Sequence, residues 1–340
     1  MFLDQVAALR DMGHEVIVVA RGTEGYVADS VRAMGIPYHG IRMKGLRDIL
    51  FLRQLVKTYK IEIIHSTLDR ADYVGLITGR ITGIPVVSTM MVPRCHPAYR
   101  FMDRVAVLSN KQRDILLAKG VAAVKIEVIR PGIDFNRFAC PDKVIRDTWN
   151  TKTAADSFDL VFCHISSMLP RKAHMVSLEL TKACRDRGAK PLLFIIGDPL
   201  EGEYVVLLKR FITEHNLDEN VVFTGWTKDV PEILSLSNYT VLPSADEALG
   251  VVLMEGMAAG TPIIAREGEG GAELIEQYNV GFLFRPSEGV PKLADEIISL
   301  NGDREQRRKL SEQCREIARR EFSMQSFGQR LTALYQDAVS

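Results

Sequence analysis

Apolar residues along the chain fall into short runs separated by longer amphipathic stretches. In the first part of the chain the short runs, which are typical of buried strands, are Glu15–Ala20, Ile36–Gly40, Ile61–His65, Pro85–Thr89, Arg104–Leu108 and Ile126–Ile129. Helical spacing is found between them in Phe2–Gly13, Tyr26–Met34, Leu46–Tyr59, Asp69–Thr82 and Lys111–Lys119. Strands that alternate with helices predict a parallel sheet covered by helices on both faces.

The same alternation resumes later in the chain. The predicted strands there are Asp159–Ile165, Pro191–Gly197, Val221–Phe223, Tyr239–Leu242 and Pro262–Ala265, and the predicted helices are His174–Arg187, Glu203–His215 and Val230–Ser237. Two charged amphipathic helices, Asp303–Arg320 and Ser323–Val339, follow. The polar stretch 141–157 has no sustained period and is interpreted as a linker. We therefore expect two α/β domains, at residues 1–140 and 158–322.

The beginning of the chain departs from this pattern. A doubly wound domain normally begins with a strand and a glycine-containing turn that leads into its first helix. Here the sequence begins inside that helix at Met1. We expect the first sheet to lack a central strand, and we attribute this to a start codon placed too late, with an authentic loss of the strand as the alternative.

Composition narrows the class of protein. The 340 residues include 43 basic and 43 acidic side chains, so the net charge of zero offers no argument for a nucleic-acid partner. Five dispersed cysteines predict reduced thiols and a cytoplasmic location. No apolar run is long enough to span a bilayer, and the N-terminus lacks the features of a signal peptide.

The stretch Tyr239–Ile275 carries the candidate chemistry. Glu247 lies in the loop after a strand, Gly250 opens the next helix, and Glu255 lies on its second turn. Glycine allows a close approach of the backbone, and the first amides of a helix are suited to a phosphate. Both carboxylates can therefore face a ligand at the start of this helix. The same spacing also separates Glu288 and Glu296, so a pair of solvated acids is the alternative.

The order of residues in this stretch resembles the donor-binding core of the retaining family 4 glycosyltransferases, which have the GT-B fold. The matching residues are Glu247, Gly250, Glu255, Gly260-Thr-Pro262, Gly270-Gly271 and Glu273. Arg130-Pro-Gly-Ile-Asp134, followed by Phe138, is similar to a second motif of that family. The resemblance implies two Rossmann-like doubly wound parallel-sheet domains that face a cleft, with the last helix, 323–340, packing back on the first domain.

The resemblance also implies a diphosphate clamp after the first strand of the second domain. The family has Gly-Arg, four residues, then Lys-Gly, and Lys172 matches the lysine. Ser167 stands at the arginine position and Ala173 at the second glycine, so part of the clamp is replaced. The neighbouring Arg171 is a candidate substitute. A solvated loop lysine is the alternative for Lys172.

Further donor contacts are implied by the same resemblance. Glu255 would accept hydrogen bonds from the ribose hydroxyls, and Glu247 would lie against the donor sugar. The backbone amides of Gly250, Val251 and Val252 would bind the distal phosphate. Residues near the nucleotide base would be Gly225, Trp226 and Lys228, with a core position for Trp226 as the alternative.

Acceptor-side residues are less well matched. His65 ends a predicted strand and is a candidate catalytic residue in contact with the acceptor or the sugar, or else a structural residue. Met91 occupies the position where many family members have a histidine that touches the donor sugar. His65 or His96 is a candidate replacement, and Arg94 is a candidate contact for an acidic acceptor.

Other catalytic motifs are missing. There is no Gly-x-Ser-x-Gly elbow, His-Glu-x-x-His pair, P-loop or Asp-x-Asp triplet, and Gly268–Gly271 lacks the third glycine of a dinucleotide fingerprint. We predict a retaining hexosyltransferase that uses a UDP- or GDP-sugar and a glycan or lipid-linked acceptor. We expect no metal or other cofactor, and peripheral contact with the inner face of a membrane. The alternatives are a nucleotide-sugar epimerase and a nucleotide-sugar-binding protein with impaired catalysis.

Overall fold

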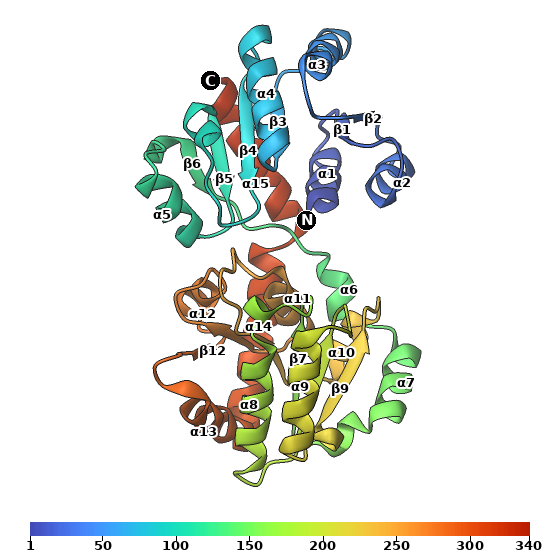
Figure 1. Cartoon of the computed structure of the whole chain (residues 1–340), viewed down its shortest axis with the longest axis vertical. Helices are drawn as coiled ribbons and strands as arrows, with labels where there is room; N and C mark the ends of the chain where they lie inside the picture. Colours follow the sequence, from blue (N-terminus) through green and yellow to red (C-terminus); the bar gives the residue numbers. More distant parts are fainter. The chain divides into compact units, whose positions relative to one another are not determined.

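The chain forms two compact α/β units in the computed structural model, which describes residues Met1–Ser340 (Figure 1). Unit 1 consists of Met1–Ile133 and Phe322–Ser340, and unit 2 consists of Asp134–Glu321. All of the paired strands are parallel. Five short 3₁₀ helices lie between the main elements, at Pro97–Phe101, Ala123–Lys125, Ala155–Ser157, Pro170–Lys172 and Asp218–Asn220.

Unit 1 contains two separate sheets. Strands β1 (Val18–Arg21) and β2 (Tyr38–Ile41) pair only with each other. Strands β3 (Ile64–Thr67), β4 (Val86–Met90), β5 (Arg104–Val107) and β6 (Ile126–Val128) form a four-stranded sheet in that order. The doubly wound sheet expected from the sequence is therefore in two pieces here, because no strand joins β1 to β3.

Helices from both ends of the chain complete unit 1. They are α1 (Phe2–Asp11), α2 (Tyr26–Ala33), α3 (Leu46–Thr58), α4 (Asp69–Thr82), α5 (Asn110–Ala118) and the C-terminal α15 (Met324–Val339). Helix α15 packs against α1, and Leu9, Leu331 and Tyr335 share one buried cluster with Val87 of β4. The backbone amide of Ile133 donates to the carbonyl of Phe322 at 2.8 Å, next to the residues where the chain leaves and re-enters this unit.

Unit 2 is built on a single six-stranded sheet. Its strands are β7 (Leu160–Ile165), β8 (Pro191–Ile196), β9 (Val221–Gly225), β10 (Tyr239–Leu242), β11 (Ile263–Arg266) and β12 (Gly281–Phe284). The spatial order is β12-β11-β10-β7-β8-β9. From β7 the chain adds strands toward one edge, returns at β10, and then adds strands toward the other edge. The order of winding therefore reverses between β7 and β10.

The helices of unit 2 cover this sheet. They are α6 (Phe135–Ala139), α7 (Lys143–Thr153), α8 (His174–Arg185), α9 (Glu203–Glu214), α10 (Val230–Leu236), α11 (Val251–Ala259), α12 (Ala272–Tyr278), α13 (Gly289–Gly302) and α14 (Arg304–Glu321). Every residue of β8 and of β10 is buried, which explains why all of them except Thr240 are apolar or aromatic. None of the helices of the chain combines the length and the hydropathy that a bilayer-spanning segment requires.

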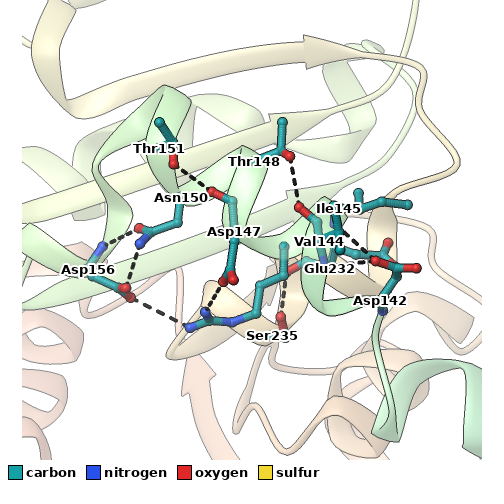
Figure 2. Close-up of polar contacts among 11 residues, drawn as sticks. Asp142, Val144, Ile145, Asp147, Thr148, Asn150, Thr151, Asp156, Glu232 and Ser235 are labelled. Atoms are coloured by element: carbon teal, nitrogen blue, oxygen red, sulfur yellow. Dashed lines mark hydrogen bonds and ion pairs between the residues drawn. The ribbon is translucent and has the colours of Figure 1, made fainter.

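The prediction of a linker at residues 141–157 is wrong, because most of this stretch is helix α7. The Oδ1 atom of Asp142 accepts from the amides of Val144 at 2.8 Å and Ile145 at 3.1 Å (Figure 2). The amide of Asp142 donates to Oε1 of Glu232 on α10 at 3.1 Å, so the start of α7 is attached to unit 2. No residue of α7 is fully buried. Its sequence therefore lacks the apolar period that would have predicted a helix.

We expect Asp142→Ala to lower the free energy of unfolding by about 1 kcal/mol, because the helix loses the acceptor for two of its first amides. Urea unfolding followed by circular dichroism measures the change. The matched control is Asp147→Ala, which removes only an exposed ion pair with Arg146 and should cost less than about 0.5 kcal/mol. Equal effects of the two substitutions would contradict the role of the Asp142 cap.

Candidate active site

Two charged side chains meet where the order of the strands reverses in unit 2. Lys172 lies in the loop after β7 and Glu247 in the loop after β10, and the lysine Nζ is 2.5 Å from Oε2 of the glutamate. Their side chains are 14% and 16% exposed, so the ion pair is largely shielded from water. In open α/β sheets the reversal at the carboxyl ends of the strands is the usual position of a ligand site. The topology thus brings together a cation and a carboxylate that are distant in the sequence.

Backbone hydrogen bonds hold three loops around this ion pair. The bonds are Ala245 N to Arg171 O at 2.8 Å, Glu247 N to Glu269 Oε2 at 2.8 Å, and Gly270 N to Glu247 O at 3.2 Å. A Cβ atom on Gly270 would lie 1.8 Å from the carbonyl oxygen of Ala248, so only glycine fits at this contact. The side chain of Glu269, which sequence analysis did not single out, therefore positions Glu247 through its backbone.

Helix α11 presents a short exposed strip beside the loop that carries Glu247. Gly250 precedes the helix with φ +82°, and no side chain caps the first turn. Val251, Val252 and Glu255 are partly exposed, whereas the other six residues of α11 are buried. Because Val251 and Glu255 are four residues apart, they lie on the same face. The first turn of α11 and Glu255 therefore share one partly exposed strip of the helix, which is suited to a ligand with both phosphate and hydroxyl groups.

A stacked pair of buried histidines lies under the loop that carries Lys172. His164 of β7 and His174, the first residue of α8, have ring centroids 4.1 Å apart and ring planes 8° from parallel. The hydroxyl of Ser166 is 3.1 Å from Nε2 of His164 and 3.0 Å from Nε2 of His174. The serine thus connects both rings to the start of the loop. The sequence carried one signal of this cluster, a histidine within an otherwise apolar strand.

Both histidines are held in the neutral form. Burial lowers the pKa of His174 to about 4, and the positive charge of Lys172 contributes to the same shift. Burial also lowers the pKa of His164 well below its ordinary value, with smaller contributions from His174 and Lys172. The two histidine rings therefore add no charge beside Lys172 near neutral pH, and they act as uncharged support for its loop.

The remaining residues predicted on the donor side lie at loop positions of unit 2. Gly225, with φ +71°, ends β9, which is separated from β7 by β8. Trp226 is 75% exposed, so the alternative of a core position is excluded. Lys228, Ser167 and Arg171 are also exposed, and the guanidinium of Arg171 makes no ion pair. These side chains are therefore accessible to a ligand.

Two family models together match most of the chain. The model described as Glycosyltransferase Family 4 matches residues 1–137, and the model described as Glycosyl transferases group 1 matches residues 145–317. The chain belongs to the family 4 glycosyltransferases. This family membership confirms the resemblance on which the sequence analysis depended.

Solved structures confirm the GT-B fold of this glycosyltransferase. The Anabaena Alr3699/HepE structure in complex with UDP has a TM-score of 0.86 at 20% identity and covers 98% of this chain and 94% of its own. A glycosyltransferase from Rickettsia africae has a TM-score of 0.88 at 18% identity, with coverage of 99% and 94%. At these identities the likeness shows the fold alone.

Characterised relatives are glycosyltransferases with different donors. The Escherichia coli UDP-Gal:alpha-D-GlcNAc-diphosphoundecaprenol alpha-1,3-galactosyltransferase is 27% identical over 76% of this chain and 72% of its own length. A GDP-mannose-dependent alpha-(1-6)-phosphatidylinositol monomannoside mannosyltransferase from Mycobacterium tuberculosis is 26% identical over 60% of this chain and 54% of its own. These names describe glycosyl transfer to lipid-linked molecules in both cases.

His65 does not have the free ring nitrogen that the predicted catalytic role requires. Nδ1 is 2.6 Å from the hydroxyl of Tyr335 and 2.7 Å from the amide of Gln5, and Nε2 is 2.7 Å from the hydroxyl of Thr89. Burial lowers the pKa of His65 to about 3. We therefore assign His65 to the packing of β3 against α1 and α15, because both nitrogens are already used inside unit 1.

His96, considered above as a replacement for the histidine missing at Met91, is also bonded within unit 1. Its Nε2 is 2.8 Å from Oδ2 of the buried Asp72, and its ring stacks on Tyr99 with centroids 4.0 Å apart. The same carboxylate accepts from the hydroxyls of Ser66 and Ser88, each at 2.6 Å. His96 thus attaches the loop after β4 to the core of unit 1.

No group of three or more histidine, cysteine, aspartate or glutamate side chains in the chain is arranged to hold a metal ion. The polar groups that the protein contributes to the candidate site are instead one ammonium group, two carboxylates and backbone amides. This donor set is suited to phosphate and hydroxyl groups.

We expect the free energy of unfolding to fall as the pH is lowered from about 6.5 to about 4. The unfolded chain binds a proton at the ordinary pKa of His174, 6.5, whereas the folded chain resists protonation until about 4. Within this window each such histidine contributes a slope of up to about 1.4 kcal/mol per pH unit. Urea unfolding at several pH values gives the free energy of unfolding as a function of pH. This free energy should change less steeply with pH in His174→Gln than in the unsubstituted chain. Identical slopes would contradict a buried neutral His174.

Proposed function

We propose that this glycosyltransferase moves a sugar from a nucleoside diphosphate to an acceptor hydroxyl with retention of anomeric configuration. The observation that carries the proposal is the Lys172–Glu247 ion pair beside the first amides of α11, at the reversal of strand order. A cation and a helix N-terminus supply positive charge for a departing diphosphate. A carboxylate in contact with that cation supplies an acceptor for sugar hydroxyls.

Lys172 and Glu247 exchange partners when a donor binds. The distal phosphate of the donor competes with Glu247 for Nζ of Lys172, and the amides of Val251 and Val252 bind the same phosphate. Negative charge on this phosphate grows as its bond to the anomeric carbon breaks, so these groups stabilise the transition state more than the ground state. Glu247, released from the lysine, accepts from hydroxyls of the sugar, and Glu255 accepts from the ribose.

The acceptor oxygen forms its bond on the face of the sugar that the phosphate leaves. The bond from the anomeric carbon to the phosphate breaks, and the proton of the acceptor hydroxyl passes to an oxygen of the departing phosphate. The site contains no protein nucleophile in the mechanism we propose, so catalysis consists of positioning and charge stabilisation. Arg171 is free of ion pairs and supplies a second cation, and the hydroxyl of Ser167 replaces the arginine of the usual clamp. We propose that no metal ion takes part, since the lysine and the amides supply the positive charge.

The donor is a UDP- or GDP-sugar in this proposal. Relatives that use UDP-Gal and GDP-mannose support a nucleoside diphosphate sugar, and so does the fold shared with proteins solved with UDP and UDP-glucose. The exposed ring of Trp226 supplies a surface on which a base can stack.

We also propose a lipid-linked acceptor at the cytoplasmic face of a membrane. The support is that relatives act on molecules named as diphosphoundecaprenol and phosphatidylinositol derivatives. Transfer to such an acceptor needs a surface of the enzyme that contacts the bilayer.

Donor binding is expected to depend on Glu255. A thermal-shift screen of UDP, GDP and their sugars should find a ligand that stabilises the chain, by about 2.7 kcal/mol at roughly 100 times its dissociation constant. Glu255→Ala should abolish most of this shift, because the ribose hydroxyls lose their acceptor. Glu288→Ala is the control, since that carboxylate pairs on the surface with Lys292. A full shift in the Glu255 variant would rule out the proposed ribose contact.

Turnover is expected to depend on Lys172. Lys172→Gln should lower kcat by about a hundredfold to a thousandfold, because charge on the departing phosphate is left without its cation. Donor consumption by nucleotide release is the measurement, and Lys209→Gln, an exposed lysine of α9, is the control. Tight nucleotide binding without turnover in the unsubstituted chain would instead support a binding protein. Recovery of the donor as an epimer would support the epimerase.

A further inference from the structure

Residues 42–60, which comprise α3 and the turn before it, form a strongly basic surface on unit 1, the α3 surface. Its six cations are Arg42, Lys44, Arg47, Arg53, Lys57 and Lys60, and all of them are exposed. Its one acidic residue is Asp48, whose carboxylate accepts from the backbone amide of Lys44 at 2.6 Å. None of the six cations makes an ion pair with a carboxylate. The positive charge of this surface is therefore not neutralised within the chain.

Helix α14 shows the usual arrangement for comparison. It is also rich in cations, but Arg308 pairs with Glu305 and Glu312, and Lys309 pairs with Glu305. Such pairs at helical spacing are typical of a helix face that only meets water. The α3 surface lacks them, so its charges are available to an external partner.

Apolar side chains accompany these charges on the solvent side of α3. Leu46 is 69% exposed and Leu50 is 53% exposed. They continue into Arg53 and Lys57 along one strip of the helix, at spacings of four, three and four residues. The buried residues of α3 are Ile49 and Leu55, so the exposed leucines are not needed to attach the helix to unit 1.

The net charge of zero for the whole chain is the sum of opposite net charges on the two units. Unit 1 contains 20 basic and 13 acidic residues, a formal charge of +7, whereas unit 2 contains 23 basic and 30 acidic residues, a charge of −7. Most of the exposed large apolar side chains also belong to unit 1. The α3 surface, with its unpaired cations and exposed leucines, therefore belongs to the positively charged unit. The Lys172–Glu247 site belongs to the negatively charged unit.

We propose that the α3 surface binds the headgroup layer of an anionic lipid bilayer. Leu46 and Leu50 enter the boundary between headgroups and acyl chains, while the surrounding cations contact lipid phosphates. Helices with this combination bind at membrane interfaces, and the attraction increases with each cation close to an anionic surface. A nucleic acid or an acidic protein would use the charges but would leave the leucines without a role. The inference rests on the proposed function only in the use that we assign to the membrane contact, which is access to a lipid-linked acceptor.

Cosedimentation of the full chain with vesicles tests this contact. One set of vesicles is phosphatidylcholine alone, and in the other about one lipid in three is phosphatidylglycerol. The chain should bind the anionic vesicles, with an affinity that falls as salt is added, and should bind the neutral vesicles weakly.

Two double substitutions separate the contributions of charge and apolar surface. Arg53→Gln with Lys57→Gln, and separately Leu46→Ser with Leu50→Ser, should each weaken binding to anionic vesicles by roughly tenfold. The matched controls lie on unit 2, Val206→Ser with Leu207→Ser for exposed apolar residues and Arg308→Gln with Lys309→Gln for paired cations. Both controls should bind as the unsubstituted chain does, and every variant should keep its nucleotide-induced thermal shift, which also shows that it is folded.

Three results would overturn the proposal. They are equal binding to neutral and anionic vesicles, loss of binding in the unit 2 controls, and binding that survives both α3 double substitutions. Binding that depends on Arg53 and Lys57 but not on Leu46 and Leu50 would indicate a general polyanion site, and the assignment to a bilayer would be wrong. Because vesicle binding is measured without a sugar donor, failure of the proposed transfer reaction would not change this outcome.

Discussion

The reversal of strand order between β7 and β10 is the constraint on which the rest of unit 2 depends. The two strands are neighbours in the sheet, although β8 and β9 separate them in the sequence. Their carboxyl ends therefore bring Lys172 and Glu247 within 2.5 Å of each other. Glu269 and Gly270 add the third loop, and α11 begins directly after the loop that carries Glu247. The candidate site follows from this topology because charges from distant segments converge where no strand connection covers the sheet edge.

The electrostatics of this site depend on burial as much as on charge. Lys172 lies above two stacked histidines whose pKa values are lowered by burial, so the rings support the loop without adding charge. The lysine is then neutralised by one carboxylate until a more highly charged anion arrives. In the transfer reaction that we propose, such an arrangement is preorganised, since the groups assigned to the departing phosphate are in position before the donor binds.

In unit 1, a histidine at the end of a strand has a structural role and not the predicted contact with the substrate. His65 was predicted to face the substrate because it ends an apolar strand. Its ring instead connects β3 to Gln5 of α1 and Tyr335 of α15, so it contributes to the contact between the two ends of the chain. The sequence could not show this, because Tyr335 lies 270 residues away from the histidine. The unpaired cations of α3, by contrast, remain outside this interior network.

The sequence by itself determined the alternating α/β architecture, the family, and the residue types of the donor side, since apolar period and short motifs are local properties. It also indicated the glycine at the start of α11 and the glutamates on either side of it. It did not predict α7, because that helix buries no residue completely and has no apolar period. Nor did it predict the histidine pair, the role of Glu269, or the interior position of His65. Those depend on which distant segments meet, and the folding of the chain in three dimensions decides that.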